Sequence, residues 1–479
     1  MITTSEKKKK QQAFATINRK AFFSVVALLV SILLLSGFLS YIVPQGVYER
    51  DATGAIILNT YTQGEISGIS FWRVLSAPVR VFGSSDGVTI IAISLFLLIM
   101  SGIFNLMDKT GGIRAFIVHI MNRLRDKGGP VVCLTVLIFM LFGSLFGMFE
   151  ELVTLLPLII VFMLSMGMDS MMGLGVCLLA ACFGFSAAIT NPFSVGIASQ
   201  YAGIPTSSGI WLRLIFFAIV YVSLCCFLML YLRKIEKDPK CSLTYVQDKK
   251  RRENLDLSPT PDPENQERIF AVYSVFFIIQ GILLTLIASV RSISGLAIPI
   301  LAGSFLIFGL TAGFLVSKKP GQALRWFGQG AAAMLPAVAM IAIASSVKLV
   351  MEESGIIDTI MHGALQLFAN SNKFAAILLI YLLILFLQLF IGSATAKIVL
   401  VMPIVVPIAR ALGISPTLVI LTYCMADGFT DVIIPTNPVL LIGLSMANIS
   451  YGKWVKWSLP FQLLNLLLTS LLLLGGLLI

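Results

Sequence analysis

The chain has 479 residues, of which 58% are hydrophobic and 12% charged, and its mean hydropathy is +0.95. Soluble domains carry about 25% charged residues, so this composition excludes a soluble globular protein and predicts an all-α polytopic membrane protein. The net charge of +11 comes from short basic clusters beside apolar segments. Orientation in the membrane explains such clusters, so we expect the bilayer, and not nucleic acid, as the partner of these charges.

The first long apolar run covers residues 21–43 and follows a basic tail. It is long enough to span a bilayer and no small-residue cleavage site follows it, so we expect a retained membrane anchor. Other predicted spans cover residues 87–107, 209–232, 269–290, 295–316, 332–351 and 457–479. The seven cysteines lie mostly in apolar runs without metal-ligand spacing, which predicts free thiols and no metal site.

Two further apolar runs, 171–202 and 417–448, contain the same triplet, Thr190-Asn191-Pro192 and Thr436-Asn437-Pro438, 246 residues apart. Pro192 and Pro438 each remove a backbone N–H and crowd the preceding turn, so the runs predict two broken helices. Broken helices at matched positions in two halves of a membrane protein indicate the substrate site of a secondary transporter.

The two runs belong to a longer repeat. A shift of 246 residues aligns 157–192 with 403–438 with 7 identities in 36 positions. The matches include the residues that shape backbones, Pro157 with Pro403 and Gly167 with Gly413, besides the two triplets. This pattern predicts an internal duplication.

Before each broken helix, residues 129–167 and 374–412 form two apolar limbs around a polar turn, which predicts a re-entrant hairpin in each half. A plain pair of spanning helices is the alternative.

Lysine and arginine place the N-terminal tail, the arm after residue 107 and the loop 233–268 in the cytoplasm. The acidic arm after Glu352 then lies outside, so the repeat is inverted, with a cytoplasmic N-terminus and an external C-terminus in the cytoplasmic membrane.

Five charged residues are predicted to lie deep in the membrane: Glu150, Glu151, Lys397, Asp427 and Asp431. A charge at mid-membrane costs about 3 kcal/mol on insertion scales and is a functional candidate by default. The structural alternative is an internal ion pair of Lys397 with Glu151 or Asp431. One lysine cannot neutralise four acids, so at least two remain for a proton, a metal ion or a cationic substrate group.

Three strings give the chain a family resemblance: YIVPQGVY at residues 41–48, GMFEE at 147–151 and ADGFTD at 426–431. They resemble the YfcC family, which is related to the four-carbon dicarboxylate carriers and the aminobenzoyl-glutamate transporters of the ion transporter superfamily. The likeness covers nearly the whole chain except loop 233–268. Two departures lie at the predicted site: Asp431, where the family carries asparagine, and Asn437-Pro438, where serine-glycine is commoner.

The resemblance implies an inverted-repeat elevator-type transporter that works as a homodimer, and some YfcC-like proteins are described as basic amino acid exchangers. A mobile module of both hairpins and both broken helices would carry substrate past a stationary scaffold. The corresponding division is 1–128 for the tail, first spans and cytoplasmic arm, 129–208 for module half 1, 209–232 for a scaffold span, 233–268 for a cytoplasmic linker, 269–373 for scaffold spans and the external arm, 374–448 for module half 2, and 449–479 for the final scaffold span.

The predicted substrate is an amino acid, basic like arginine or ornithine, moved by antiport. The half-helix N-termini would attract its carboxylate, and the acids would hold its amino or guanidinium group. The expected hydrogen-bond donors are Thr190, Asn191, Thr395, Thr436 and Asn437. A sodium- or proton-coupled carrier of a four-carbon dicarboxylate or a peptide-like substrate is the alternative, and no cofactor beyond such an ion is expected.

Two other protein classes fit less well. An intramembrane enzyme could use two of the buried acids, but the chain has no HExxH motif and its only histidines, His119 and His362, lie in the predicted arms. A channel would show a filter in a ring-forming oligomer and not an inverted duplicate with prolines at mid-membrane. We therefore expect no enzyme.

Overall fold

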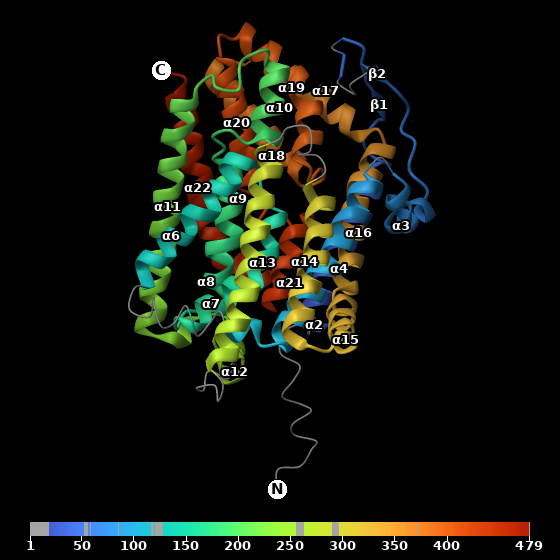
Figure 1. Ribbon diagram of the computed structural model, residues 1–479. Helices are drawn as coiled ribbons and strands as arrows, with labels where there is room; N and C mark the ends of the chain where they lie inside the picture. The colour runs from blue at the N-terminus through green and yellow to red at the C-terminus, as the bar shows by residue number, and fades with distance from the viewer. Residues whose placement is uncertain are drawn as a thin grey trace.

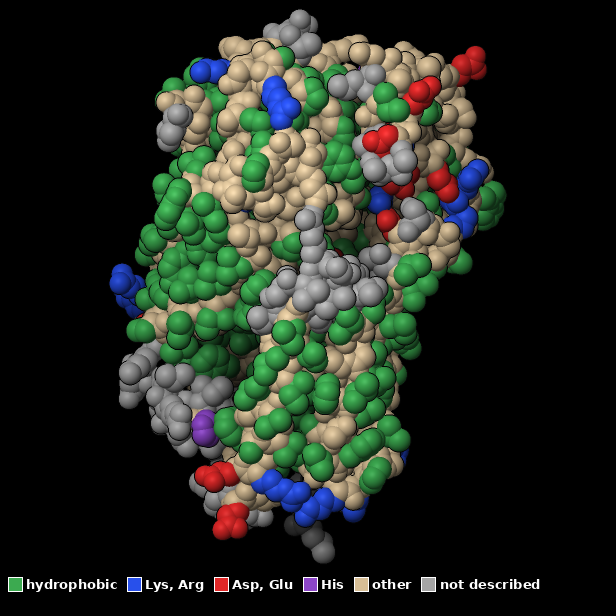
Figure 2. Space-filling model, turned by 45° about the horizontal axis from the view of Figure 1, so that its top comes forward, with side chains coloured by type: hydrophobic (Ala, Val, Ile, Leu, Met, Phe, Trp, Pro, Cys, Tyr) green, Lys and Arg blue, Asp and Glu red, His purple; other side chains and the backbone are tan. Residues whose placement is uncertain are grey.

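The computed structural model describes residues 19–51, 56–57, 59–84, 86–115, 119, 128–254, 263–289, 297–369 and 371–478. Eight helices within these residues are long and apolar enough to cross a membrane, whereas β1 (Gly46–Val47) and β2 (Thr62–Gln63) form a two-residue antiparallel ladder. The predicted all-α polytopic membrane fold is confirmed. Figure 2 shows a broad hydrophobic surface across the middle of one face, with charged side chains gathered toward its two ends.

One group of helices packs together beside α4 (Gly87–Lys109), the helix that most of its members contact (Figure 1). The others are α2 (Arg19–Leu39), α13 (Pro263–Ser289), α14 (Ala297–Ser317), α15 (Pro320–Ala333) and α16 (Leu335–Glu353). The sequence predicted a single span at 332–351. The structure adds α15 before it, joined to α16 at Met334, two residues before Pro336, which lacks the N–H that a continuous helix would use.

The second group contains the two hairpins. The first consists of α6 (Gly128–Leu141), the π-helical turn η2 (Phe142–Phe146), the short 3-10 helix η3 (Glu151–Leu155) and α7 (Leu156–Ser165). The second consists of α18 (Lys373–Gln388) and α19 (Ala394–Ala411). In Figure 1, α7 lies in the lower part of the molecule and α19 near the top. The hairpins therefore lie toward opposite ends of the molecule.

The broken helices run in opposite directions. The first starts low in Figure 1 and ends at the top with α10 (Ile197–Ala202), whereas the second starts at the top with α20 (Pro416–Gly428) and ends low with α21 (Pro438–Ala447). Two helices, α11 (Ile210–Lys237) and α22 (Tyr451–Gly476), pack against this group. Whether they belong functionally to the scaffold, as the sequence predicted, stays a prediction. The first broken helix comprises α8 (Ser170–Leu174), η4 (Gly175–Leu179), α9 (Ala180–Ser186), η5 (Pro192–Gly196) and α10 (Ile197–Ala202), and the second comprises α20 (Pro416–Gly428) and α21 (Pro438–Ala447).

The backbone repeats the duplication seen in the sequence. Gly167 and Gly413 both take positive φ, +84° and +71°, in the turn that precedes each broken helix. Each broken helix is then capped by the next matched pair, since Asp169 accepts a hydrogen bond from Met172 N and Ser415 accepts one from Leu418 N. Equivalent turns and caps at positions 246 apart confirm that the two halves share one local fold.

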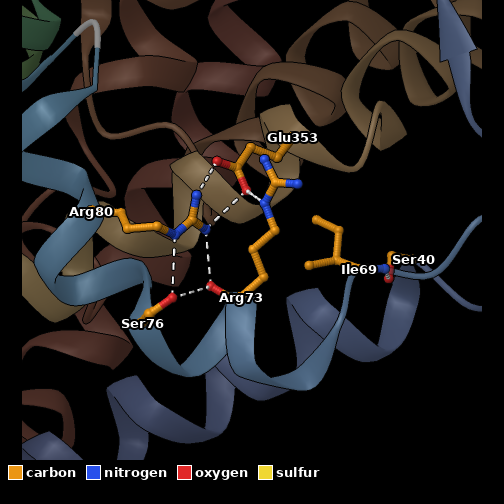
Figure 3. A network of polar contacts seen from close by, with 6 residues as sticks. All are labelled: Ser40, Ile69, Arg73, Ser76, Arg80 and Glu353. Atoms are coloured by element: carbon orange, nitrogen blue, oxygen red, sulfur yellow. Dashed lines mark hydrogen bonds and ion pairs between the residues drawn. The ribbon is translucent and has the colours of Figure 1, made fainter.

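Outside the bundle, the surface helix α3 (Phe71–Arg80) is fastened to the end of α16 (Figure 3). Arg80 binds both carboxylate oxygens of Glu353, at 2.5 and 2.9 Å, and Arg73 Nε lies 3.4 Å from the same carboxylate. A second contact ties the β1 segment to α17 (Ile356–Ala369), where Asp358 accepts from Tyr48 N and pairs with Arg50. The acidic arm predicted from the sequence is thus a docking surface for Pro44, Gly46, Tyr48, Arg50 and Tyr61.

The segment 233–268 is partly folded. After α11 come the turn η6 (Pro239–Cys241) and the helix α12 (Tyr245–Asn254), which packs against α7. Asp248 is buried and accepts from Ser170 N at 2.9 Å and from Ser170 Oγ at 2.5 Å. Residues 238–254 therefore form a docked element within the segment that the sequence predicted as a linker. Residues 255–262 lie outside the described chain, as do the basic tail and most of the first arm.

Candidate functional site

At each helix break, the asparagine side chain caps the half-helix that follows. Asn191 Oδ1 accepts hydrogen bonds from the N–H groups of Phe193 and Ser194, and Asn437 Oδ1 accepts from those of Val439 and Leu440, at 2.9 and 3.3 Å in both cases. The following prolines start the second half-helix, where a missing N–H costs nothing. The triplet thus caps the N-terminus of η5 in the first half and of α21 in the second. Both asparagines are buried.

Each break is also bonded to the tip of its own hairpin. Thr190 Oγ1 donates to Leu145 O at 3.0 Å, and Thr436 Oγ1 donates to Leu389 O at 3.1 Å. In the first half, Ser144 adds to this contact, because its carbonyl oxygen accepts from Ile189, Thr190 and Asn191 N. The hairpin tips and the helix breaks therefore contact each other in both halves, with the threonines bonded to backbone.

The buried lysine pairs with Asp427. Lys397 lies in α19 and Asp427 in the last turn of α20, and both residues are fully buried. The ion pair expected from the sequence is present, but the expected partners were Glu151 or Asp431, and that choice is wrong for Asp431. The reason is that α20 ends at Gly428, so Asp431 lies beyond the helix end, where it accepts hydrogen bonds from Gln388 and Asn437. The side chain of Glu151 lies outside the described residues.

Asp431 is held by amides. Its Oδ1 accepts from Asn437 Nδ2 at 2.8 Å and from Gln388 Nε2. Asn191 Nδ2, the matched donor in the first half, has no hydrogen-bond partner among the described residues. The 246-residue shift places Phe185 where the second half has Asp431. The two half-sites are therefore chemically different: the second is rich in carboxylate, and the first offers an unused donor.

The remaining predicted site residues lie around this centre. Glu150, at the tip of the first hairpin, lines a cavity together with residues of α4 and α21 and interacts electrostatically with Asp431. Thr395 is half-buried in the first turn of α19, two residues before Lys397. The structure thus brings together residues from both hairpins and both breaks.

Sequence reasoning missed Gln388 and Ser144. Both are buried polar residues within apolar limbs of the hairpins, directly before Leu389 and Leu145, the residues whose carbonyls bind the threonines. A polar residue in an apolar hairpin limb, at the same place in both hairpins, could have been recognised in the sequence. It identifies the position in each hairpin that faces the helix break.

The arrangement can bind a small polar ligand with groups of both signs. Half-helix N-termini and the amide of Asn191 favour an anionic group, whereas Asp431 and Glu150 favour a cationic one. Buried groups in a low-dielectric setting make each such contact selective. No cluster of three metal-binding His, Cys, Asp or Glu side chains occurs in the described part of the chain.

An inverted pair of hairpins and broken helices around a buried polar centre defines this molecule as a membrane transporter. The chain belongs to the C4-dicarboxylate anaerobic carrier family (DcuC), whose model matches residues 22–477. The membrane-transporter class and the family predicted from the sequence are both confirmed.

The individual proteins that resemble this chain have low sequence identity to it. The chain is 25% identical to the putative basic amino acid antiporter YfcC of Escherichia coli over 405 residues, covering 82% of this chain and 79% of that one. It is 27% identical to an uncharacterized protein of Haemophilus influenzae over 388 residues, covering 80% and 74%. Among solved structures, the YdaH transporter of Alcanivorax borkumensis matches with 20% identity and a TM-score of 0.44, covering 95% of this chain and 98% of that one. MtrF of Neisseria gonorrhoeae, from a class of antimetabolite efflux pumps, matches with 16% identity and a TM-score of 0.42, covering 94% of each chain.

Proposed function

We propose that the protein is a secondary transporter that exchanges amino acids with a cationic side chain, of the arginine or ornithine type. The observation that carries the proposal is the charge balance at the site: Lys397, the buried lysine among the described residues there, is already paired with Asp427, so Asp431 has only the neutral amides of Gln388 and Asn437 as hydrogen-bond donors. A cationic substrate group compensates Asp431, whereas a dicarboxylate adds to the repulsion. The relation to a putative basic amino acid antiporter agrees with this choice.

The substrate carboxylate belongs at the first half-site in this proposal. Asn191 Nδ2 is a buried donor with no partner among the described residues, and it stands at the N-terminal end of η5. An unsatisfied buried donor costs about 1–3 kcal/mol, which a ligand carboxylate recovers on binding. The zwitterion then lies with its carboxylate at Asn191 and its positive groups toward Asp431 and Glu150.

Movement follows an elevator-type alternating-access scheme. The hairpins and broken helices form one module, and the helices around α4 form the scaffold along which it moves. The packing of the described helices into two groups supports this division. Assembly as a homodimer in the cytoplasmic membrane, with the N-terminus inside, is part of the same proposal.

A four-carbon dicarboxylate carrier is the second candidate, because the family description names that substrate class. Two asparagine-capped half-helix N-termini give it two anion sites. Sodium or protons would then have to neutralise Asp431.

Counterflow in proteoliposomes separates these candidates. Vesicles loaded with unlabelled arginine, ornithine, succinate or fumarate are offered the same compounds labelled, with and without sodium and a pH gradient. The proposal expects saturable uptake of labelled arginine driven by internal arginine or ornithine without either gradient. Uptake of succinate or fumarate that requires sodium or protons, without arginine uptake, replaces it with the dicarboxylate candidate.

A further inference from the structure

Arg213 is a buried arginine that is bound by carbonyl groups and not by an acid. It lies near the start of α11, and 3% of its surface is exposed. Its Nη2 donates to the backbone carbonyls of Thr206 and Ser208, the latter at 3.0 Å. Among the residues that the structure describes, Nε and Nη1 have no hydrogen-bond partner and no carboxylate pairs with the guanidinium. A positive charge is thus held inside the molecule by neutral groups.

The second repeat has a cation at the matching position but leaves it exposed. A shift of 243 residues aligns Gly-Ile-Trp at 209–211 with Gly-Lys-Trp at 452–454, and it aligns Arg213 with Lys456. Lys456 is exposed near the start of α22. An exposed lysine keeps its charge in water or among lipid headgroups, whereas Arg213 keeps its charge inside the protein. The burial of Arg213 is therefore specific to the first half.

The charge of Arg213 acts toward the first half-site. Cys424, on α20, interacts electrostatically with Arg213 and lies beside Ser194. Ser194 follows the first break and donates its N–H to the side chain of Asn191. Ser194 Oγ and Asn191 Nδ2 are both buried without a hydrogen-bond partner among the described residues. Both groups can donate to an anion, and Arg213 adds a positive potential to them.

The two half-sites therefore differ in the sign of their fixed charge. In the second, Asp431 accepts hydrogen bonds from neutral amides, and Lys397 is bound to Asp427. In the first, the nearby charge is the guanidinium of Arg213. At an effective dielectric constant of about 20, unit charges about 12 Å apart interact strongly enough to change an affinity about tenfold. Arg213 therefore influences a bound anion without touching it.

We propose that Arg213 sets the preference for a carboxylate at the first half-site, by holding a buried positive charge near Asn191 and Ser194. The inference rests on the proposed exchange of amino acids and assigns recognition of the substrate carboxylate to a residue outside both helix breaks. Arg213 is a positioning residue, because it acts through the electrostatic potential at the site. A neutral residue at position 213 weakens binding of the carboxylate and leaves recognition of the cationic side chain intact.

The test compares arginine with agmatine, which keeps the guanidinium and the amine of arginine and lacks the carboxylate. Counterflow with purified protein in liposomes gives kcat/KM for each compound. The wild type is expected to prefer arginine by at least about tenfold. In Arg213→Gln that preference falls by about tenfold because the KM for arginine rises, while agmatine exchange does not fall.

Two variants separate the charge of Arg213 from its packing. Arg213→Lys keeps a positive charge at this position and retains the wild-type preference for arginine. Lys456→Gln is the matched control, because it removes the exposed cation at the equivalent position of the second repeat and leaves the preference unchanged.

A further pair of variants offsets the charge from α20. Cys424→Asp places a carboxylate within electrostatic reach of Arg213, so it lowers the preference for arginine as Arg213→Gln does, whereas the neutral Cys424→Asn does not. Size-exclusion profiles and melting temperatures establish which variants are folded. This pair keeps the inference open to refutation if Arg213→Gln does not fold.

The outcomes are distinguishable. Wild-type protein that exchanges neither arginine nor ornithine refutes the proposed function, and the inference with it. Wild-type exchange of arginine with an unchanged preference in folded Arg213→Gln, or with equal loss of both compounds, overturns the role of Arg213 and leaves the proposed function in place. A preference that is lost in folded Arg213→Lys as well assigns the effect to packing and also overturns that role.

Discussion

Phe183 and Phe429 are equivalent residues of the two repeats, and their rings touch each other, with centroids 4.8 Å apart at an interplanar angle of 67°. The preceding pair behaves in the same way, since Cys182 Sγ donates to Gly428 O, again across a separation of 246 residues. Equivalent residues can contact each other only near a symmetry axis. The approximate two-fold axis of the duplication therefore passes between α9 and the end of α20.

The first prediction concerns this aromatic pair. Edge-to-face rings are worth about 0.5–1.5 kcal/mol beyond their burial, so Phe183→Leu and Phe429→Leu should show a coupling energy of about 1 kcal/mol in a double-mutant cycle. Unfolding of the purified protein in mild detergent measures it. Strictly additive losses in free energy would contradict a direct contact at the axis.

The second prediction tests sidedness. Cys241 is exposed beside α12 at the predicted cytoplasmic end, and Glu65 is exposed in the segment next to β2 at the opposite end. An impermeant maleimide added to intact cells should label Glu65→Cys and leave Cys241 unlabelled, whereas inverted vesicles should give the reverse. With exposed Cys226 replaced by Ser as background, labelling of both from one side is incompatible with the inverted repeat.

Cys241 also gives a pH prediction. Its thiol donates to Asp238 Oδ2 at 3.2 Å, and this hydrogen bond raises the pKa of Cys241 above its ordinary value. A raised pKa leaves less thiolate near neutral pH, so Asp238→Asn should lower the pKa and speed the reaction with maleimide at pH 7. The difference should vanish when the pH exceeds the pKa in both proteins. Equal rates at pH 7 would show that the contact is absent in the membrane.

The fourth prediction concerns the pair of Lys397 and Asp427. Removing one partner leaves an uncompensated buried charge, so Lys397→Met should destabilise the protein by about 3–5 kcal/mol. The double variant Lys397→Met with Asp427→Leu should recover most of that loss, because apolar residues can replace a buried pair at little cost. Melting temperatures in detergent provide the measurement. A double variant less stable than Lys397→Met would mean that Asp427 has another essential partner.

The fifth prediction concerns the donor on Asn191. Asn191→Asp keeps a good helix cap but exchanges the free Nδ2 donor for a negative charge, so the KM for arginine should rise by at least about tenfold, or about 1.4 kcal/mol. Asn372→Asp is the matched control, because Asn372 is an exposed cap that accepts from Ala375 N at the start of α18. An unchanged KM in Asn191→Asp would remove this residue from the carboxylate site.

The sequence predicted the breaks and the repeat because both are local. Proline and asparagine at 191–192 and 437–438 act on their own turn, and glycine at 167 and 413 supplies a backbone that other residues rarely adopt. Such signals need no tertiary information, so the order of hairpins and half-helices follows from the chain alone.

The partner of Lys397 could not be predicted in this way. Asp427 and Asp431 are four residues apart and would share a face if the helix continued, but α20 ends between them and they face different neighbours. The role of Gln388 depends equally on a contact across 43 residues. The docking of α12 was missed because its anchor, Asp248, is polar and becomes buried only against Ser170.

The hydrogen bonds between each hairpin tip and its helix break determine the free energy needed to separate the two, and these bonds differ between the two halves. In the first hairpin, the carbonyl and hydroxyl oxygens of Ser144 together hold four groups of residues 187–191, and Thr190 holds Leu145. In the second, the matching contacts are Thr436 with Leu389 and Gln388 with Asp431. Each buried hydrogen bond left unmade costs about 1–3 kcal/mol. Separating the first hairpin from its break therefore breaks several hydrogen bonds to backbone, whereas separating the second also breaks the buried pair of Lys397 with Asp427, so neither hairpin leaves its broken helix without losing buried polar contacts.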